Sequence, residues 1–349
     1  MKRLPAALLL VVTLLAGLGM STSTTRAEPT GVYLALGDSV AVGIGSSLPR
    51  ERGYAALIGQ QVAAWSDGTM RVRNLARSGE TATSLRDDGQ LDAALQEIAL
   101  AAANGTPVRA ITLTVGGNDV IALQDLPAAN RQRALSTYTD ALERILADLR
   151  AAVGAETPIV LTTLWDPTPL RDADLDAAGW VVRFNDAIVA AAATGDARVA
   201  DLTPAFAADL RSFTYEPTDI HPTNTGHRVI ADLVWQALAL DTVAPVLEVP
   251  TELTSRRVAL TLTVQATDDT DVTAVEVTAH DDVLTVSGPW QTEDDTWVVL
   301  LEPQTTVGDA GTLSLTVAAR DAAGNVADAT ISVAIETPGA TSTQEGGAP

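Results

Sequence analysis

The spacing of hydrophobic and polar positions changes once along the chain, near residue 241. Before that point, short apolar runs alternate with alanine-rich stretches in which apolar residues recur at helical spacing. We expect strands at 32–38, 69–76, 109–119, 157–166 and 197–203. We expect helices at 134–153, 178–193 and 225–240. Apolar strands that alternate with helices predict a parallel sheet covered by helices on both faces.

After residue 241 the helical spacing disappears, and Val, Thr and Leu alternate with polar residues in short segments. These segments lie at 257–267, 272–280, 296–302, 312–321 and 325–335. Acidic or glycine-containing turns separate them, which is typical of an antiparallel β-sandwich of about 90 residues. The sequence DAAGN at 321–325, together with APV at 244–246, resembles bacterial Ig-like modules.

The first 27 residues have the layout of a secretory signal peptide. Lys2 and Arg3 precede an apolar run at 4–20, and a Ser/Thr stretch leads to Ala27. We predict cleavage after Ala27 and export of the protein. An uncleaved membrane anchor is the alternative, which the shortness of the run and its two glycines disfavour.

Charge and composition exclude several functions. The formal net charge is −22, and an acidic surface repels nucleic acid and anionic lipid headgroups, so we expect no nucleic-acid partner. The chain contains no cysteine, which excludes disulfides and thiol chemistry. No HExxH motif occurs, and we expect no cofactor and no catalytic metal.

The acidic turns of the C-terminal half leave one metal alternative open. Asp268, Asp269 and Asp271, or the segment 321–325, could bind Ca²⁺ through loop carboxylates. Turn formation and solvation explain these acids equally well. We interpret His280, in the same half, as a surface residue.

Polar sequences follow the first three predicted strands and precede the last predicted helix. They are GDS at 37–39, NLARSGET at 74–81, GGND at 116–119 and DIHPTNTGH at 219–227. The carboxyl ends of parallel strands meet at one edge of a sheet, where ligands bind. We therefore expect the four sequences to converge there.

The residue types suit nucleophilic acyl transfer. A serine hydroxyl needs a base within hydrogen-bond reach, and His221 is the best candidate for Ser39. The backbone N–H groups of Ser39 and Gly79 and the side-chain amide of Asn118 could stabilise a developing oxyanion. The structural alternatives are an N-cap role for Ser39, an Asx turn at Asn118 and Asp119, and a positive φ at Gly79.

Taken together, GDS with Gly43, SGET, GGND and HP resemble the blocks of the SGNH, or GDSL-type, hydrolases over about residues 32–240. The resemblance implies a flavodoxin-like three-layer α/β/α fold and hydrolysis of carboxylic esters through an acyl-enzyme. It implies Ser39 as the nucleophile, His221 as the base, and Ser39, Gly79 and Asn118 as the oxyanion hole. The chain lacks the GxSxG elbow of ordinary α/β-hydrolases.

The chain departs from the family pattern beside the histidine. The family usually has its acid three residues before the histidine, where this chain has Thr218. We predict that Asp219, two residues before His221, orients the ring instead. Glu216 or a backbone carbonyl is the alternative.

We predict a signal peptide at 1–27, an SGNH hydrolase domain at 28–241, an all-β Ig-like sandwich at 242–336 and a disordered tail at 337–349. The expected function is that of a secreted esterase or lipase acting on a small-molecule, lipid or acylated-carbohydrate ester. The alternatives are a polysaccharide O-acetylesterase and a catalytically inactive extracellular binding or adhesion protein. The C-terminal module could contact a cell surface or a polysaccharide.

Three further side chains have two interpretations each. Trp165 and Phe184 line an acyl pocket or belong to the core, and the core interpretation is the simpler one. His227 lies on the last predicted helix, where we expect a core or surface contact rather than chemistry.

Overall fold

The computed structural model describes residues 30–66, 68–166, 177–255, 258–268, 271–280, 284–293, 295–303 and 311–335. The predicted signal peptide at 1–27 and the predicted tail at 337–349 lie outside these ranges. Among the described residues, no helix combines the length and the apolar character that crossing a membrane requires.

Parallel strands form the sheet of the N-terminal half, in the order β2-β1-β3-β4-β5. Their bounds are β1 (Gly31–Gly37), β2 (Met70–Asn74), β3 (Val108–Thr114), β4 (Ile159–Thr162) and β5 (Arg198–Ala200). All residues of β1 are buried, as are all residues of β3 except Arg109. Such continuous burial is what a parallel sheet covered on both faces requires, and it confirms the predicted fold class.

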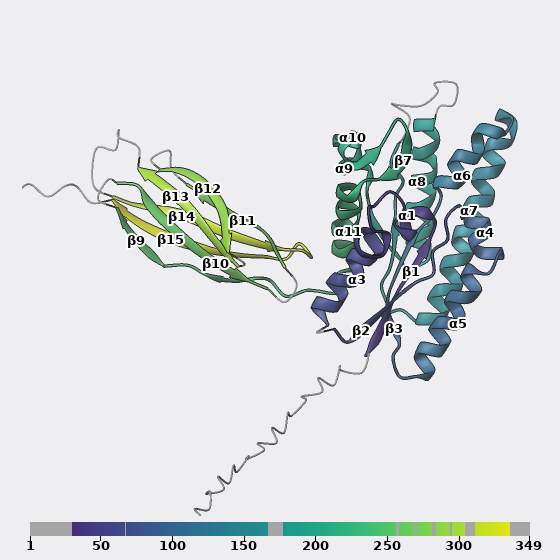
Figure 1. Ribbon diagram of the computed structural model, residues 1–349, viewed down its shortest axis with the longest axis horizontal. Coiled ribbons are helices and arrows are strands. Elements are labelled where there is room, and N and C mark those ends of the chain that lie inside the picture. Colours follow the sequence, from purple (N-terminus) through teal and green to yellow (C-terminus); the bar gives the residue numbers. More distant parts are fainter. Residues whose placement is uncertain are drawn as a thin grey trace, which may run out of the picture.

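Helices cover both faces of this sheet (Figure 1). One layer contains α4 (Ala82–Asp87), α5 (Gln90–Ala103), α6 (Gly117–Ala122), η1 (Leu123–Asp125), α7 (Ala128–Val153) and α8 (Ala177–Thr194). The other contains α1 (Ser39–Val42), α2 (Pro49–Arg52), α3 (Tyr54–Trp65), α9 (Thr203–Ala208), α10 (Leu210–Phe213) and α11 (Asn224–Leu238). In β1, Leu34 and Leu36 pack in the core of the first layer, whereas Tyr33 and Ala35 pack in the second. Alternate side chains of β1 therefore pack in the two cores on opposite faces of the sheet.

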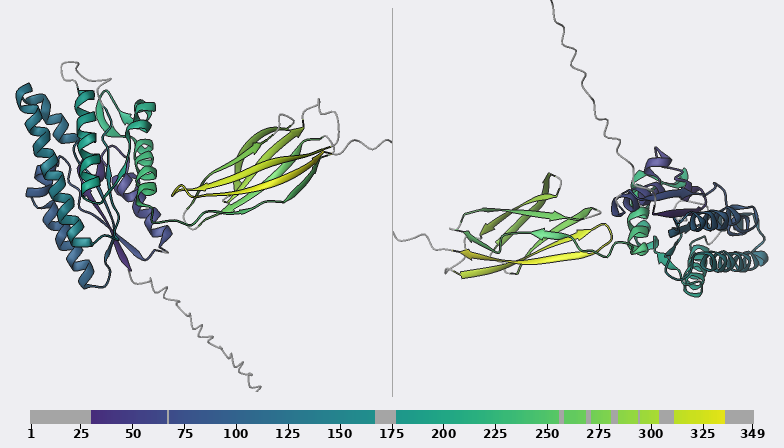
Figure 2. Two further views of the ribbon diagram at one scale, coloured as in Figure 1. Left: turned by 180° about the vertical axis from the view of Figure 1, so that it is seen from behind. Right: turned by 90° about the horizontal axis from the view of Figure 1, so that it is seen from below.

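The described part of the C-terminal half consists of two four-stranded sheets (Figure 2). The sheets have the orders β12-β13-β10-β8 and β11-β14-β15-β9. The bounds are β8 (Val246–Glu248), β9 (Glu252–Ser255), β10 (Leu260–Thr267), β11 (Val272–Ala279), β12 (Leu284–Glu293), β13 (Thr296–Pro303), β14 (Gly311–Asp321) and β15 (Val326–Ile335). In β10, Leu262, Val264 and Ala266 are buried while their neighbours are exposed, as expected for a sandwich strand.

Three strands of this sandwich, β8, β9 and β12, lie outside the segments in which we expected strands. The pattern does not indicate β12, because Gly288 and Pro289 interrupt its alternation. β12 is an edge strand, a position that tolerates proline. We expected antiparallel pairing throughout, but β9 pairs with β15 in parallel.

The turn between β14 and β15 contacts the chain that leaves α11. The side-chain amide of Asn325 donates hydrogen bonds to the backbone carbonyls of Asp241 and Val243, at 3.4 and 3.0 Å. Ala322 is buried in the core beneath α3 and α11. The DAAGN sequence therefore joins the sandwich to the α/β domain.

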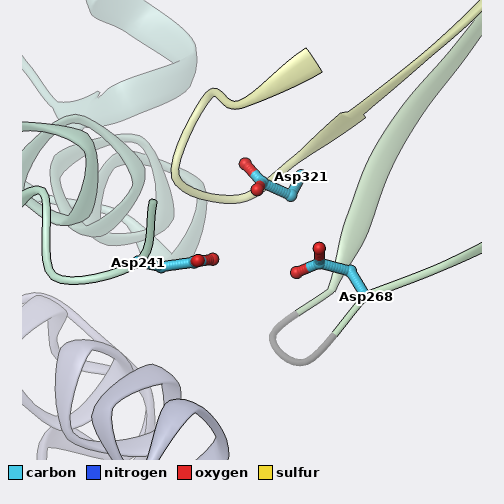
Figure 3. Close-up of side chains that lie close together, drawn as sticks. All are labelled: Asp241, Asp268 and Asp321. Carbon is cyan, nitrogen blue, oxygen red and sulfur yellow. The ribbon is translucent and has the colours of Figure 1, made fainter. Parts of the chain in front are cut away.

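Three carboxylates meet at the same junction (Figure 3). Oxygen atoms of Asp241, Asp268 and Asp321 lie within 4.8 Å of one another, and the first and last of these residues are 2% and 1% exposed. Burial raises the pKa of Asp321; hydrogen bonds from Asn325 oppose this, and the other two carboxylates add to the increase. The like charges therefore oppose folding at neutral pH.

We expect Asp268→Asn to raise the thermal unfolding midpoint at pH 7. The Asp268 carboxylate is one of the charges that raise the pKa of Asp321. A raised folded-state pKa of Asp321 costs stability above its unfolded pKa of about 3.9, and the cost fades as the pH falls. If the substitution removes about 1 kcal/mol of charge repulsion, the unfolding midpoint should rise by about 2–4 °C. Calorimetry at pH 7 and pH 4 should show a gain that shrinks in acid. Asp328→Asn, at an exposed position of β15, is the control for net charge. A lower midpoint for Asp268→Asn at pH 7 would contradict the expectation.

Candidate active site

The end of β1 and a short hairpin bring Ser39 and His221 together. Ser39 begins α1 directly after β1 and is 9% exposed. The hairpin consists of β6 (Thr214–Tyr215) and β7 (Asp219–Pro222), which pair antiparallel. His221 Nε2 lies 2.9 Å from Ser39 Oγ, within hydrogen-bond distance.

Asp219 contacts the other nitrogen of the same ring. Its Oδ1 lies 2.6 Å from His221 Nδ1 and accepts a hydrogen bond from the His221 backbone N–H at 3.1 Å. Burial acts to raise the pKa of Asp219, but the hydrogen bonds from His221 outweigh it, so the pKa lies below its ordinary value. Thr218, at the family's usual acid position, instead donates its hydroxyl to the Tyr215 carbonyl. The structure therefore places Asp219, and not Thr218, against the ring.

Contacts on both sides hold the hairpin in place. Thr223, which follows the hairpin, caps α11 by accepting the Gly226 N–H at 3.2 Å. The Tyr215 hydroxyl donates to the Gly45 carbonyl at 2.9 Å. Gly45 has a φ of +95°, and a Cβ there would collide with the Pro222 carbonyl and lie 2.9 Å from His221 Cβ. Only glycine lets this loop pass so close to the histidine.

The structure brings the candidate oxyanion donors to the loops after β2 and β3. Asn118, in α6, lines the cleft that also contains Ser39, and its Nδ2 donates to the Glu80 carbonyl at 2.8 Å. That amide carries a second N–H, which can serve a carbonyl oxygen. Gly79 lies beside Glu80, exposed and with a φ of +86°. The backbone N–H of Ser39 has no partner within its own helix, because Ser39 is the first helical residue.

The buried carboxyl group of Asp38 and the half-buried one of Asp119 support these loops. Asp38 accepts the Val40 N–H at 2.9 Å and so caps α1. Burial is the main cause that raises its pKa to about 7, and Asp119 adds to the increase. Asp119 accepts the N–H of Ala82, at the start of α4, and burial raises its pKa to about 7 as well. Asp119 therefore links two loops, which a purely local Asx turn would not do.

An apolar cleft extends from Ser39 along the ends of β3 and β4. Its space, including the mouth, is about 620 Å³, and its apolar walls are Val40, Val120, Ile121, Leu164, Trp165, Val181 and Ile220. The Trp165 ring stacks on Phe206 with centroids 4.6 Å apart, which holds it in place. Phe184 is fully buried in the core against Tyr138. Of the two aromatic candidates, Trp165 lines the cleft and Phe184 does not.

A family model described as the GDSL-like lipase/acylhydrolase family matches residues 35–229. The chain belongs to this family. It is therefore an ester hydrolase, and the match spans every candidate site residue from Ser39 to His221. The match ends before the C-terminal sandwich, so the Ig-like nature of that part stays a prediction.

Similar folds occur among solved structures. The α/β hydrolase LAE5, from the metagenome of Lake Arreo in Spain, is 21% identical, with 61% of this chain and 97% of LAE5 covered and a TM-score of 0.47. The acetylxylan esterase Axe2 from Geobacillus stearothermophilus is 18% identical, with 62% of this chain and 97% of Axe2 covered and a TM-score of 0.49. No curated protein sequence matches the chain.

In this GDSL-like hydrolase, His227 has a structural position next to the site. Its ring is fully buried; Nδ1 accepts the Tyr54 backbone N–H at 3.2 Å, and Nε2 lies 2.9 Å from the Ile44 carbonyl. This pairing requires a neutral ring that donates from Nε2. Burial lowers the pKa of His227 from its ordinary value. The residue thus links α11 to α3 and to the loop after Ser39.

Within the described ranges, the junction carboxylates of Asp241, Asp268 and Asp321 are the group that could hold a metal ion. Carboxylate oxygens suit Ca²⁺, but three carboxylates supply only part of its usual shell of about six to eight oxygens. Of the acids that the sequence suggested for calcium, Asp268 and Asp321 belong to this group and Asp271 does not. Asp269 lies outside the described residues.

We expect the stability of this hydrolase to fall in acid because of His227. A histidine whose folded-state pKa is lowered contributes stability above its unfolded pKa of about 6.5. That stability is lost as the pH falls through this value, by at most about 1.4 kcal/mol per pH unit. Urea unfolding at pH 8 and pH 5.5 should show a smaller loss for His227→Gln than for the wild type. His280→Gln, at an exposed position, is the matched control, and an unchanged pH dependence in His227→Gln would argue against this role.

Proposed function

We propose that the chain is an exported serine esterase or lipase that cleaves carboxylic esters through an acyl-enzyme on Ser39. The observation that carries this proposal is the 2.9 Å approach of His221 Nε2 to Ser39 Oγ, with Asp219 at 2.6 Å from the opposite ring nitrogen. A serine hydroxyl becomes an effective nucleophile when an oriented base accepts its proton. The predicted signal peptide at 1–27 supports export.

In the first half-reaction, Ser39 Oγ attacks the ester carbonyl carbon while His221 Nε2 takes the hydroxyl proton. The N–H groups of Ser39, Gly79 and Asn118 donate to the oxygen that becomes negatively charged. Asp219 stabilises the imidazolium of His221. The ester C–O bond then breaks, and the imidazolium gives its proton to the departing alcohol.

In the second half-reaction, His221 takes a proton from water, and the resulting hydroxide attacks the acyl group on Ser39. The same N–H groups stabilise the second oxyanion. The bond from the acyl carbon to Ser39 Oγ breaks, the proton on His221 returns to Oγ, and the carboxylic acid leaves.

The walls of the cleft favour an acyl chain over an acetyl group. Val120, Ile121 and Leu164 offer an apolar surface to a bound chain, and each methylene buried there contributes about 0.8 kcal/mol. Esters with longer acyl chains are therefore the first candidates for the substrate, and the O-acetyl groups of a polysaccharide are the second.

The C-terminal sandwich has a separate role in this proposal. Every residue that lines the cleft lies between Asp38 and His221, in the α/β domain. We therefore assign the sandwich no part in the chemistry, and its proposed role is contact with a cell surface or a polysaccharide.

Replacing Ser39 with Ala should lower kcat/KM for p-nitrophenyl butyrate by about 10,000-fold or more, because the acyl-enzyme can no longer form. A fluorophosphonate probe should label the wild type and not the variant. Ser136→Ala, at an exposed position of α7, is the matched control. Near-wild-type turnover by a folded Ser39→Ala variant would refute the proposal. A folded wild type that the probe does not label would favour the inactive adhesion protein.

With p-nitrophenyl esters of acetate, butyrate, hexanoate and octanoate, kcat/KM should rise about fourfold for each added methylene until the cleft is filled. Ile121→Ala should flatten this rise, because it removes part of the apolar wall. Acetate esters of longer alcohols show whether the cleft binds the acyl group or the alcohol. If it binds the acyl group, kcat/KM should not rise with the length of the alcohol. Acetate as the best acyl group, together with release of acetate from an acetylated polysaccharide, would identify an O-acetylesterase instead.

A further inference from the structure

Gln90 is a fully buried polar side chain at the start of α5, and both ends of its amide bond to Gly37. Its Oε1 accepts the Gly37 backbone N–H at 2.7 Å, and its Nε2 donates to the Gly37 carbonyl at 3.0 Å. Gly37 is the last residue of β1 and stands two positions before Ser39. The glutamine therefore fixes the backbone that leads into the candidate nucleophile.

The same amide reaches the loop that carries Gly79. Nε2 of Gln90 also donates to Glu80 Oε1 at 3.3 Å. Glu80 is buried, follows Gly79 directly, and accepts the Asn118 side-chain amide through its backbone carbonyl. One side chain thus contacts both the segment before Ser39 and the segment after Gly79, and Asn118 binds the second of these.

The position of Gln90 follows from where β2 ends. β2 pairs with β1 as far as Asn74, opposite Ala35. Two further backbone N–H groups then donate to β1, that of Leu75 to the Ala35 carbonyl and that of Arg77 to the Gly37 carbonyl. Within the described residues, the chain after Arg77 makes no further backbone hydrogen bond to β1 and continues to Gly79 and α4. A buried backbone N–H needs a partner, and the Gln90 amide supplies it to Gly37 where a longer β2 would have done so.

We propose that Gln90 is a positioning residue for the oxyanion hole. It holds the loop of Gly79 at a fixed distance from the end of β1, so that the N–H groups of Gly79, Ser39 and Asn118 point to one place. This inference rests on the proposed function of Ser39. Preset donors stabilise a developing charge only if they need not move when it forms, and a displacement of about 1 Å can cost about 100-fold in rate.

The test compares two variants at this position with a variant elsewhere in the same helix. Gln90→Leu keeps the volume and removes every hydrogen bond, whereas Gln90→Asn keeps the amide but withdraws it by one methylene. Ile98→Ala removes a buried side chain of α5 that belongs to the hydrophobic core. It is the matched control for lost stability.

We expect Gln90→Leu to lower kcat for p-nitrophenyl butyrate by about 10- to 100-fold with little change in KM. Its affinity for a trifluoromethyl ketone, which forms a charged adduct with the serine, should fall by a similar factor. Gln90→Asn should lie between the wild type and Gln90→Leu. Ile98→Ala should lower the unfolding midpoint without changing kcat.

Wild-type kcat and ketone affinity in either Gln90 variant would overturn the inference. So would a loss of kcat in Ile98→Ala that matches the loss in Gln90→Leu at equal stability. Failure of the proposed function is a different result, in which the wild type shows no Ser39-dependent turnover and no labelling by the fluorophosphonate.

Discussion

The hydrogen bond between Ser39 Oγ and His221 Nε2 joins segments that are 182 positions apart, and the arrangement of the site depends on it. It forms because β1 is buried on both faces, which fixes the point at which the chain leaves the sheet. The hairpin of β6 and β7 meets that point from the side of α11. The candidate oxyanion donors and the cleft belong to loops that leave the same edge, so one sheet positions the candidate donors and the cleft beside Ser39.

Periodicity in the sequence predicts the parallel sheet because short apolar runs such as β1 alternate with segments of helical spacing, which is typical of strands covered on both faces. The candidate site could be located from residue types, because Ser39 and Asn118 follow strands whose ends converge. His221 lies in the segment before the last helix, which can reach the same edge. The role of Gln90 could not be predicted in this way. A glutamine at the start of a helix is typical of a solvent-exposed first turn, and its burial depends on how α5 packs against β1.

Asp219 illustrates the limit of local sequence reasoning. Both Thr218 and Asp219 lie close enough along the chain to reach His221, and the hairpin geometry decides between them. The surroundings of the aspartates also shift their pKa values in opposite directions. Asp219 stays ionised because hydrogen bonds stabilise its charge, whereas burial raises the pKa of Asp38 and Asp119 to about 7. The same residue type therefore supports an imidazole in one place and braces loops in another.

Because Asp219 and His221 lie on the single short strand β7, the candidate acid and the candidate base form one rigid unit. A shift of the hairpin would carry both residues together, leaving their mutual hydrogen bond intact while the gap to the serine widened. Reactivity would then respond to one coordinate, the spacing between hairpin and sheet. The loop at Gly45 limits that spacing, because it packs directly against His221 and Pro222 and accepts the hydroxyl of Tyr215.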